Sequence, residues 1–90
     1  MRLGELDVGA YRIYAGAIEA PRGEGYIAAV VVLRRGSLGK PREVYRNMSL
    51  DDGHRWSSSA DALNYAITKG KEVIHTVIAL AGASTARSIK

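Results

Sequence analysis

The sequence predicts an α+β domain: a three-stranded antiparallel meander sheet with one C-terminal amphipathic helix packed on one face (β-β-β-α). Two observations lead to this prediction. Apolar, β-branched and aromatic residues alternate with others through three stretches between residues 11 and 48, which is the period of a strand. After residue 57 the apolar residues recur at intervals of three and four, which is the period of a helix that covers a core.

The predicted strands comprise residues 11–19, 26–34 and 42–48. Pro21 and the glycines that follow it predict the first turn, because proline fixes φ and glycine accepts a positive φ. Residues 36–41 predict the second turn, and residues 51–54 predict a third. Residues 1–10 predict either an ordered arm or a short extra strand.

The helix is predicted to begin after Ser58, whose hydroxyl is a good N-cap, with Asp61 three residues later. Apolar residues keep helical spacing from residue 63 to residue 78. Gly70 lies on that apolar face, so we expect the helix to approach the sheet closely there. Gly82 is the predicted stop. Residues 1–82 therefore form one domain, and residues 83–90 form a disordered basic tail.

The composition is that of a small, mildly basic domain. The chain has 90 residues, a formal net charge of +4 and no cysteine, so neither a disulfide nor a thiolate metal site can form. Its longest apolar run, residues 27–33, is far shorter than the roughly 20 residues of a membrane span. The first residues lack the apolar segment of a signal peptide. We therefore expect a soluble, cytoplasmic protein without a membrane partner.

The second predicted strand is apolar on both faces, although one helix can cover only one of them. One alternate set comprises Ile27, Ala29, Val31 and Leu33, and the other comprises Tyr26, Ala28, Val30 and Val32. If the first set faces the helix, the second points outward and is the self-association surface. A symmetric homodimer would supply the missing layer. The alternatives are that the N-terminal arm or the loop at Trp56 covers this patch.

A second candidate function is single-stranded nucleic-acid binding through an Arg/Tyr sheet face, where bases stack on aromatic rings and arginines bind phosphates. Six basic and two acidic residues lie between residues 22 and 46, and this difference of four equals the net charge. Tyr14, Tyr26 and Tyr45 would share the uncovered face if the strand registers align. The candidate residues are Arg12, Tyr14, Arg34, Arg35, Arg42, Tyr45 and Arg46. Tyrosines also suit strands and dimer contacts, and basic residues also suit exposed strand ends.

The pattern of polar residues does not predict an enzyme. His54 follows Asp51 and Asp52 in a turn, without a third metal ligand at a suitable spacing. His75 lies beside Glu72 on the helix, as an ordinary surface pair. The three serines at 57–59 suit a helix cap better than a nucleophile, because no base is placed beside them. We therefore expect no catalytic, metal or cofactor site, and a non-enzymatic interaction module.

Four segments carry a resemblance to known proteins. They are Tyr11-Arg12-Ile13, Gly25-Tyr26-Ile27-Ala28, Trp56-Ser57-Ser58-Ser59-Ala60-Asp61-Ala62 and Gly70-Lys71-Glu72-Val73-Ile74. Over residues 11–76 the chain resembles a group of small proteobacterial proteins of unknown function, which implies a strand-strand-strand-helix fold and no activity. The helix start Ala60-Asp61-Ala62-Leu63 is also similar to HicB-type antitoxins, which implies a partner-binding module. Leu33-Arg34-Arg35 departs from the proline-glycine segment expected there.

Overall fold

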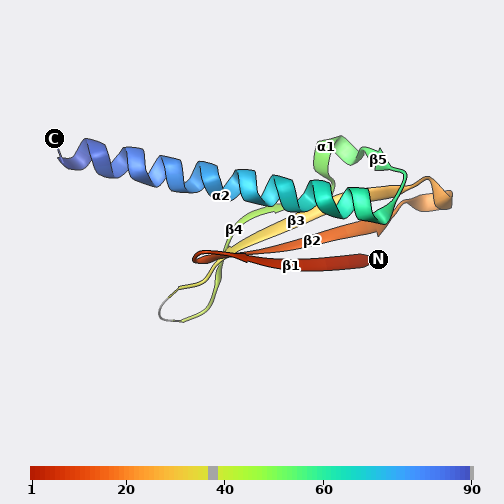
Figure 1. The fold of residues 1–90 in the computed structure, drawn as a ribbon, viewed down its shortest axis with the longest axis horizontal. Coiled ribbons are helices and arrows are strands. Elements are labelled where there is room, and N and C mark those ends of the chain that lie inside the picture. Colours follow the sequence, from red (N-terminus) through yellow and green to blue (C-terminus); the bar gives the residue numbers. More distant parts are fainter. Residues whose placement is uncertain (37–38, 90) are drawn as a thin grey trace.

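A computed structural model of the chain describes the backbone of residues 1–36 and 39–89 and the side chains of those residues up to 80. Its elements in chain order are β1 (Arg2–Val8), β2 (Tyr11–Glu19), η1 (Pro21–Gly23), β3 (Tyr26–Arg34), β4 (Arg42–Asn47), α1 (Leu50–Gly53), β5 (Arg55–Trp56) and α2 (Ser59–Ile89). The strands form one open antiparallel sheet in the order β1-β2-β3-β4, and β5 pairs with β3. α2 crosses one face of this sheet and extends past its end (Figure 1). The predicted α+β class is confirmed.

The sheet has more strands than the three predicted. β1 pairs along its whole length with β2, from Arg2 opposite Ala17 to Val8 opposite Tyr11. Residues 1–10 therefore contain a seven-residue edge strand and do not form a separate arm. This strand belongs to the fold because Leu6 and Val8 pack against the core. Its acidic residues and glycine weaken the apolar alternation by which a strand is recognised.

The predicted bounds of the first two long strands are confirmed, and the third ends one residue earlier than predicted, at Asn47. The turn between β2 and β3 is closed by the Ala20 amide, which donates a hydrogen bond of 2.9 Å to the Gly25 carbonyl. Gly25 has φ +92°, and a Cβ there would lie 2.6 Å from the Trp56 carbonyl oxygen. Only glycine fits this position, and this requirement explains why the turn could be predicted from the sequence.

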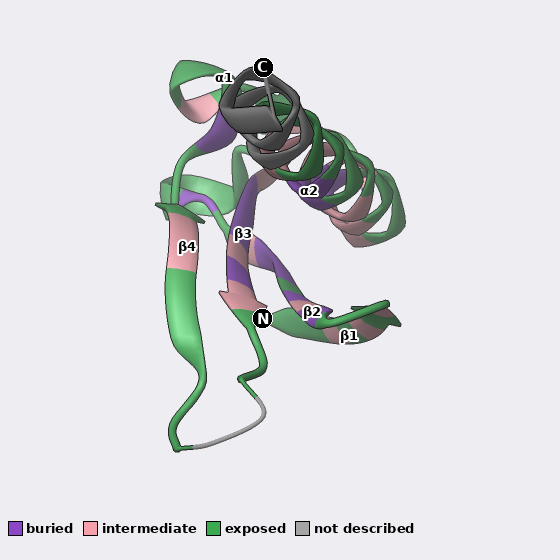
Figure 2. Cartoon of the chain, turned by 90° about the vertical axis from the view of Figure 1, so that its left-hand side faces the viewer, coloured by how far each residue is buried: buried purple, intermediate pink, exposed green. Residues whose placement is uncertain are grey.

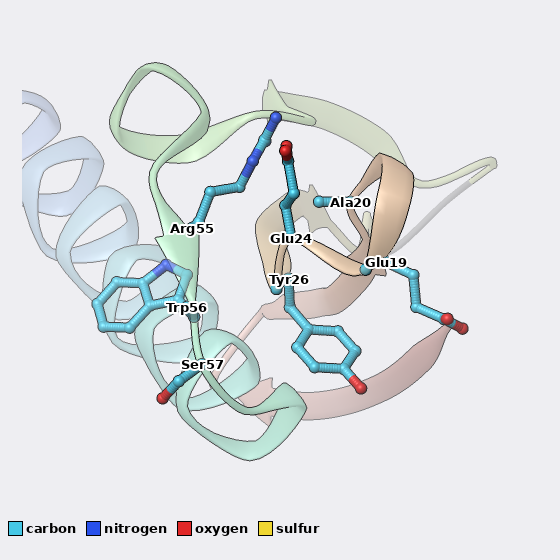
Figure 3. A pocket seen from close by; sticks show the side chains of 9 residues that line it. Glu19, Ala20, Glu24, Tyr26, Arg55, Trp56 and Ser57 are labelled. Atoms are coloured by element: carbon cyan, nitrogen blue, oxygen red, sulfur yellow. The ribbon is translucent and has the colours of Figure 1, made fainter.

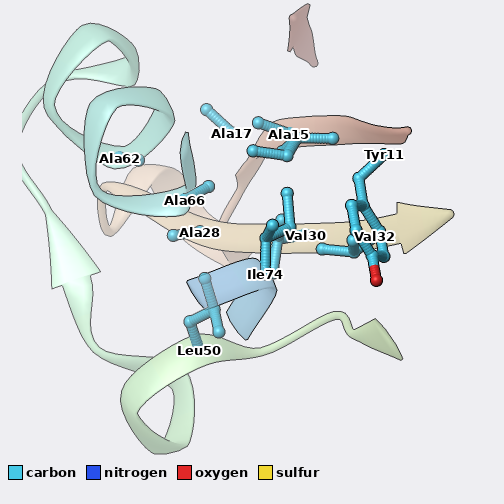
Figure 4. Close-up of a cluster of buried hydrophobic side chains, with 11 residues drawn as sticks. Tyr11, Ala15, Ala17, Ala28, Val30, Val32, Leu50, Ala62, Ala66 and Ile74 are labelled. Carbon is cyan, nitrogen blue, oxygen red and sulfur yellow. The ribbon is translucent and has the colours of Figure 1, made fainter. Parts of the chain in front are cut away.

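The core lies between α2 and the two central strands (Figure 4). Small side chains predominate in it, and the cluster comprises Tyr11, Ile13, Ala15, Ala17, Ala28, Val30, Val32, Leu50, Ala62, Ala66 and Ile74. A Cβ added at Gly70 would lie 2.8 Å from Cγ2 of Ile13, so the close approach expected at this glycine is confirmed. Viewed end-on, α2 lies over the strands β2 and β3, which carry most of the buried positions of the sheet, and β4 lies to one side of the helix (Figure 2).

The start of α2 is as predicted, and its end is not. The Ser58 hydroxyl accepts a hydrogen bond of 3.1 Å from the Asp61 amide, which confirms the cap. The helix does not stop at Gly82, and residues 83–89 continue it where a disordered tail was expected. A glycine only lowers helix propensity by about 1 kcal/mol, and no proline follows to end the helix. Residue 90 lies outside the described residues.

The predicted turn at residues 51–54 coincides with α1, whose Asp51, Asp52 and Gly53 all have positive φ. The buried side chain of Leu50 anchors this left-handed turn to the core. Within the described part of the chain, no helix is long and apolar enough to span a membrane.

Candidate functional site

The face of the sheet opposite α2 is uncovered and largely apolar. We call it the outer face. Its uncharged residues are Leu3, Tyr14, Gly16, Ile18, Ile27, Ala29, Val31, Leu33 and Met48, and the strand registers also place Glu5, Asp7, Arg12, Glu43 and Arg46 on it. Its centre is a shallow hollow of about 110 Å³ over Gly16 and Ala29. Large side chains stand around this hollow, with Leu3 73% exposed and Met48 48% exposed. An uncovered sheet face of an antiparallel sheet is normally polar, so this surface is the first candidate for binding.

The structure reverses the predicted assignment of the two faces. Ala28, Val30 and Val32 are buried beneath α2, and Tyr26 lies on the same side of the strand. The residues that point outward are the other alternate set of β3. The pairing partners decide this, because Ala15 and Ile13 pack under the helix and are paired with Val30 and Val32. Self-association stays a prediction, and its surface moves to the outer face.

Neither of the predicted covers lies on the outer face. β1 extends the sheet sideways, so residues 1–10 do not fold over it. Trp56 lies on the helix side, where its ring centroid is 4.9 Å from that of Tyr65 and 4.7 Å from that of His54. Trp56 therefore packs between a loop and the start of α2. The outer face has no cover within the described residues.

One end of the outer face carries charged residues of both signs. Arg12 donates a hydrogen bond of 2.7 Å to Asp7, and Arg46 donates one of 3.0 Å to Glu43. The bond from Arg12 lowers the pKa of Asp7 below its ordinary value, and the nearby charges of Arg12 and Arg35 lower it further. This end is therefore close to neutral, while the other end, around Leu3 and Gly16, is apolar.

The structure does not bring the predicted nucleic-acid residues to one surface. Arg12, Tyr14 and Arg46 lie on the outer face, but Arg34, Arg42 and Tyr45 lie on the helix side. The expectation that Tyr14, Tyr26 and Tyr45 share a face is wrong, because neither Tyr26 nor Tyr45 points outward. Arg35 donates a hydrogen bond to the Gly9 carbonyl and lies 3.7 Å from Asp7.

A cavity of about 530 Å³ lies beside the turn between β2 and β3 (Figure 3). Its lining residues are Glu19, Ala20, Gly23, Glu24, Gly25, Tyr26, Arg55, Trp56 and Ser57. The Nε1 atom of Trp56 is buried, and no described residue forms a hydrogen bond with it. The lining offers carboxylates and one exposed arginine, but no nucleophile placed beside a base, so it provides no arrangement for covalent catalysis.

Three other polar residues, Ser58, His75 and Tyr65, contribute to the fold or lie on its surface, and none of them forms part of a site. The Ser58 hydroxyl is used by the helix cap, and His75 is exposed on α2. Burial raises the pKa of the Tyr65 phenol, and the charge of Asp51 raises it further. Across the residues that the structure describes, no three His, Cys, Asp or Glu side chains come together as a metal site.

No protein-family model matches this sequence, and no curated protein and no solved structure matches it. The resemblances carried by the sequence motifs therefore stay predictions. A function for this chain has to come from its own surfaces, among which the outer face is the most apolar.

Proposed function

We propose that this chain is a small non-enzymatic interaction module that forms a symmetric homodimer through the outer face of its sheet. The observation that carries the proposal is the uncovered, largely apolar face, with Leu3, Tyr14 and Met48 exposed around a shallow central hollow. Burying that face removes apolar area from water, at roughly 25 cal/mol per Å². A second sheet packed against it, about 10 Å away, would complete a layered core.

The size of the face suits a dimer of modest affinity. Four strands of 7, 9, 9 and 6 residues, at about 3.3 Å per residue and about 4.8 Å apart, give a face of roughly 490 Å². Two copies would then bury roughly 980 Å² in total, somewhat below the lower limit of about 1,200 Å² for stable specific interfaces. We therefore expect dissociation in the micromolar range, where equilibrium methods detect both species.

Shape and charge both favour a second copy as the partner. The projecting Leu3 and Met48 stand beside the hollow over Gly16 and Ala29, so side chains of one copy can fill the hollow of the other. Opposite charges are already paired at the polar end of the face. A two-fold axis therefore does not bring two surfaces of one sign together.

Sedimentation equilibrium tests the proposal. Val31 lies near the middle of the face, between Tyr14 and Arg46 in the register. Val31→Glu should weaken the dimer by about 100-fold or more, because each copy loses an apolar contact of about 1.5 kcal/mol or more and buries a charge. Leu3→Glu should also weaken it, and this side chain is too exposed to affect folding strongly.

Thr68→Glu is the matched control, because it adds the same charge at an exposed position of α2. The control should dimerise like the wild-type chain, and circular dichroism should show that all variants are folded. A wild-type chain that stays monomeric at several hundred micromolar would contradict the proposal. So would equal dimerisation of Val31→Glu, Leu3→Glu and Thr68→Glu.

The alternative function is single-stranded nucleic-acid binding. It has less support, because Arg12 and Arg46 are paired with carboxylates and only Tyr14 accompanies them on the outer face. If it were correct, a labelled oligonucleotide would bind at low salt, and the logarithm of affinity would fall with a slope of about −0.7 per phosphate contact. The absence of binding at low salt would remove this alternative.

A further inference from the structure

A groove runs between β4 and α2 on the helix side of the sheet. α2 lies over β2 and β3, so β4 is left at its flank (Figure 2). Two hollows of about 290 and 390 Å³ lie along this flank and share Val44 and Val77. Val73 adds to the apolar lining. We call this the β4–α2 groove. Its size is within the usual range of about 300–1,000 Å³ for small-molecule sites.

Arg34 and Arg42 line one end of the groove. They are paired across β3 and β4, and like charges directly opposite each other destabilise a sheet. Neither guanidinium has a carboxylate within salt-bridge distance among the described residues. The residues that line this end are Ala10, Tyr11, Arg34, Arg42, Val44, Val77 and Ile78, and none of them is Asp or Glu. Two positive charges therefore lie at one end of the groove. The other end is lined by apolar residues together with Lys69 and Glu72, whose side chains form a salt bridge of 3.8 Å.

A β-bulge creates this arginine pair. The register of β3 with β4 shifts between Val32 and Leu33, so that Leu33 pairs with Glu43 and Arg34 with Arg42. Without the shift, Arg34 would lie opposite Glu43, which is a favourable cross-strand pair. The bulge instead turns Glu43 to the outer face, where it pairs with Arg46. The bulge thus prevents a cross-strand ion pair between Arg34 and Glu43 and places Arg34 and Arg42 together at the groove.

We propose that the β4–α2 groove binds an aliphatic anion, with its chain along Val44, Val73 and Val77 and its charged head on Arg34 and Arg42. Guanidinium groups bind carboxylates and phosphates in a bidentate way, and two of them at one end of the groove can share one head group. The groove lies on the opposite side of the sheet from the outer face. Its ligand binding is therefore independent of the proposed dimerisation.

Calorimetric titration with short-chain probes below their micelle concentration tests this inference. Octanoate and octyl phosphate carry the same alkyl chain with different anionic head groups. The probe that binds with the higher affinity identifies the preferred head group. Octan-1-ol, octylamine and inorganic phosphate should each bind at least tenfold more weakly than the better anion, because each lacks the anionic head or the chain. Amide shifts in NMR spectra should change most at Val44 and Val77.

Two variants and one control locate the site. Arg34→Gln should lower the affinity for the better anion at least tenfold. Arg42→Glu should abolish binding but melt no lower than the wild-type chain, because it places an opposite charge beside Arg34. Arg2→Gln, which removes a charge from the far end of the sheet, should leave binding unchanged.

The inference is overturned if neither anion binds at millimolar concentration, or if octylamine binds as well as octanoate. It is also overturned if Arg2→Gln weakens binding as much as Arg34→Gln, because the effect would then reflect net charge alone. None of these three results would bear on dimerisation, which the outer-face variants test separately.

Discussion

Replacing Gly70 with alanine tests how closely α2 approaches the sheet. In an exposed helix this change stabilises by about 1 kcal/mol. Here the new Cβ would lie 2.8 Å from Cγ2, 3.0 Å from Cδ1 and 3.1 Å from Cγ1 of Ile13, a fully buried side chain. Overpacking of this kind costs about 1–3 kcal/mol. Because three contacts are too short, we expect Gly70→Ala to lower the free energy of unfolding by about 1–2 kcal/mol.

The effect of Gly70→Ala on the free energy of unfolding should change from destabilising to stabilising when the opposing side chain of Ile13 is removed. Ile13→Ala deletes all three atoms that the new methyl group would meet, at a cost of about 2–5 kcal/mol by itself. In that background Gly70→Ala should stabilise by about 1 kcal/mol, because helix propensity then acts without a clash. The coupling between the two sites is then about 2–3 kcal/mol.

Urea unfolding of the four chains at one fixed protein concentration measures this coupling. Thr68→Ala is the control, since this residue is exposed on the same helix and should gain only a few tenths of a kcal/mol in both backgrounds. If Gly70→Ala stabilises the wild-type chain as much as the Ile13→Ala chain, the close approach of helix and sheet is refuted.

Three further predictions concern single side chains. Ser58→Ala should lower the free energy of unfolding by about 1 kcal/mol through loss of the cap, whereas Ser57→Ala, at an exposed position, should have almost no effect in the same urea titration. Trp56→Phe should cost less than about 1.5 kcal/mol, because the lost N–H has no partner, and a cost above about 3 kcal/mol would show that it has one. The pKa of Asp7 is lower in the folded chain, so its stabilising effect is complete above the ordinary Asp pKa and is lost as the pH falls through the folded value. Thermal melts should therefore show a smaller loss of stability below about pH 4 in Asp7→Asn than in the wild-type chain, and equal losses would contradict the Arg12–Asp7 contact.

The sequence predicts the long strands well because their ends carry strong local signals. The turn with Gly25 tolerates no other residue, and the cap at Ser58 depends only on residues close to it in the chain. β1 was harder to predict, because its membership depends on pairing with β2 rather than on its own alternation. Its exposed Leu3 was therefore missed as part of the candidate surface.

The residues of β3 alone could not predict which of its two alternate sets faces α2, because both sets are apolar. The signal was in β2, where Arg12 and Tyr14 alternate with Ile13 and Ala15. Combined with the register of the hairpin, this alternation would have placed Val30 under the helix. The bulge in β4 is a second case, since nothing local indicates that Arg42 rather than Glu43 should face Arg34.

The alanine-rich contact between α2 and the sheet has a consequence for how the helix is held in place. Alanine side chains at Ala15, Ala17, Ala62 and Ala66 make both surfaces smooth, so they bring the layers together but resist sliding weakly. Two contacts of large side chains, Ile13 against Gly70 and Leu63 against Gly4, therefore contribute most to the axial position of the helix. A shift by one turn, about 5.4 Å, would break both contacts and would move the residues of α2 that line the β4–α2 groove relative to the strands.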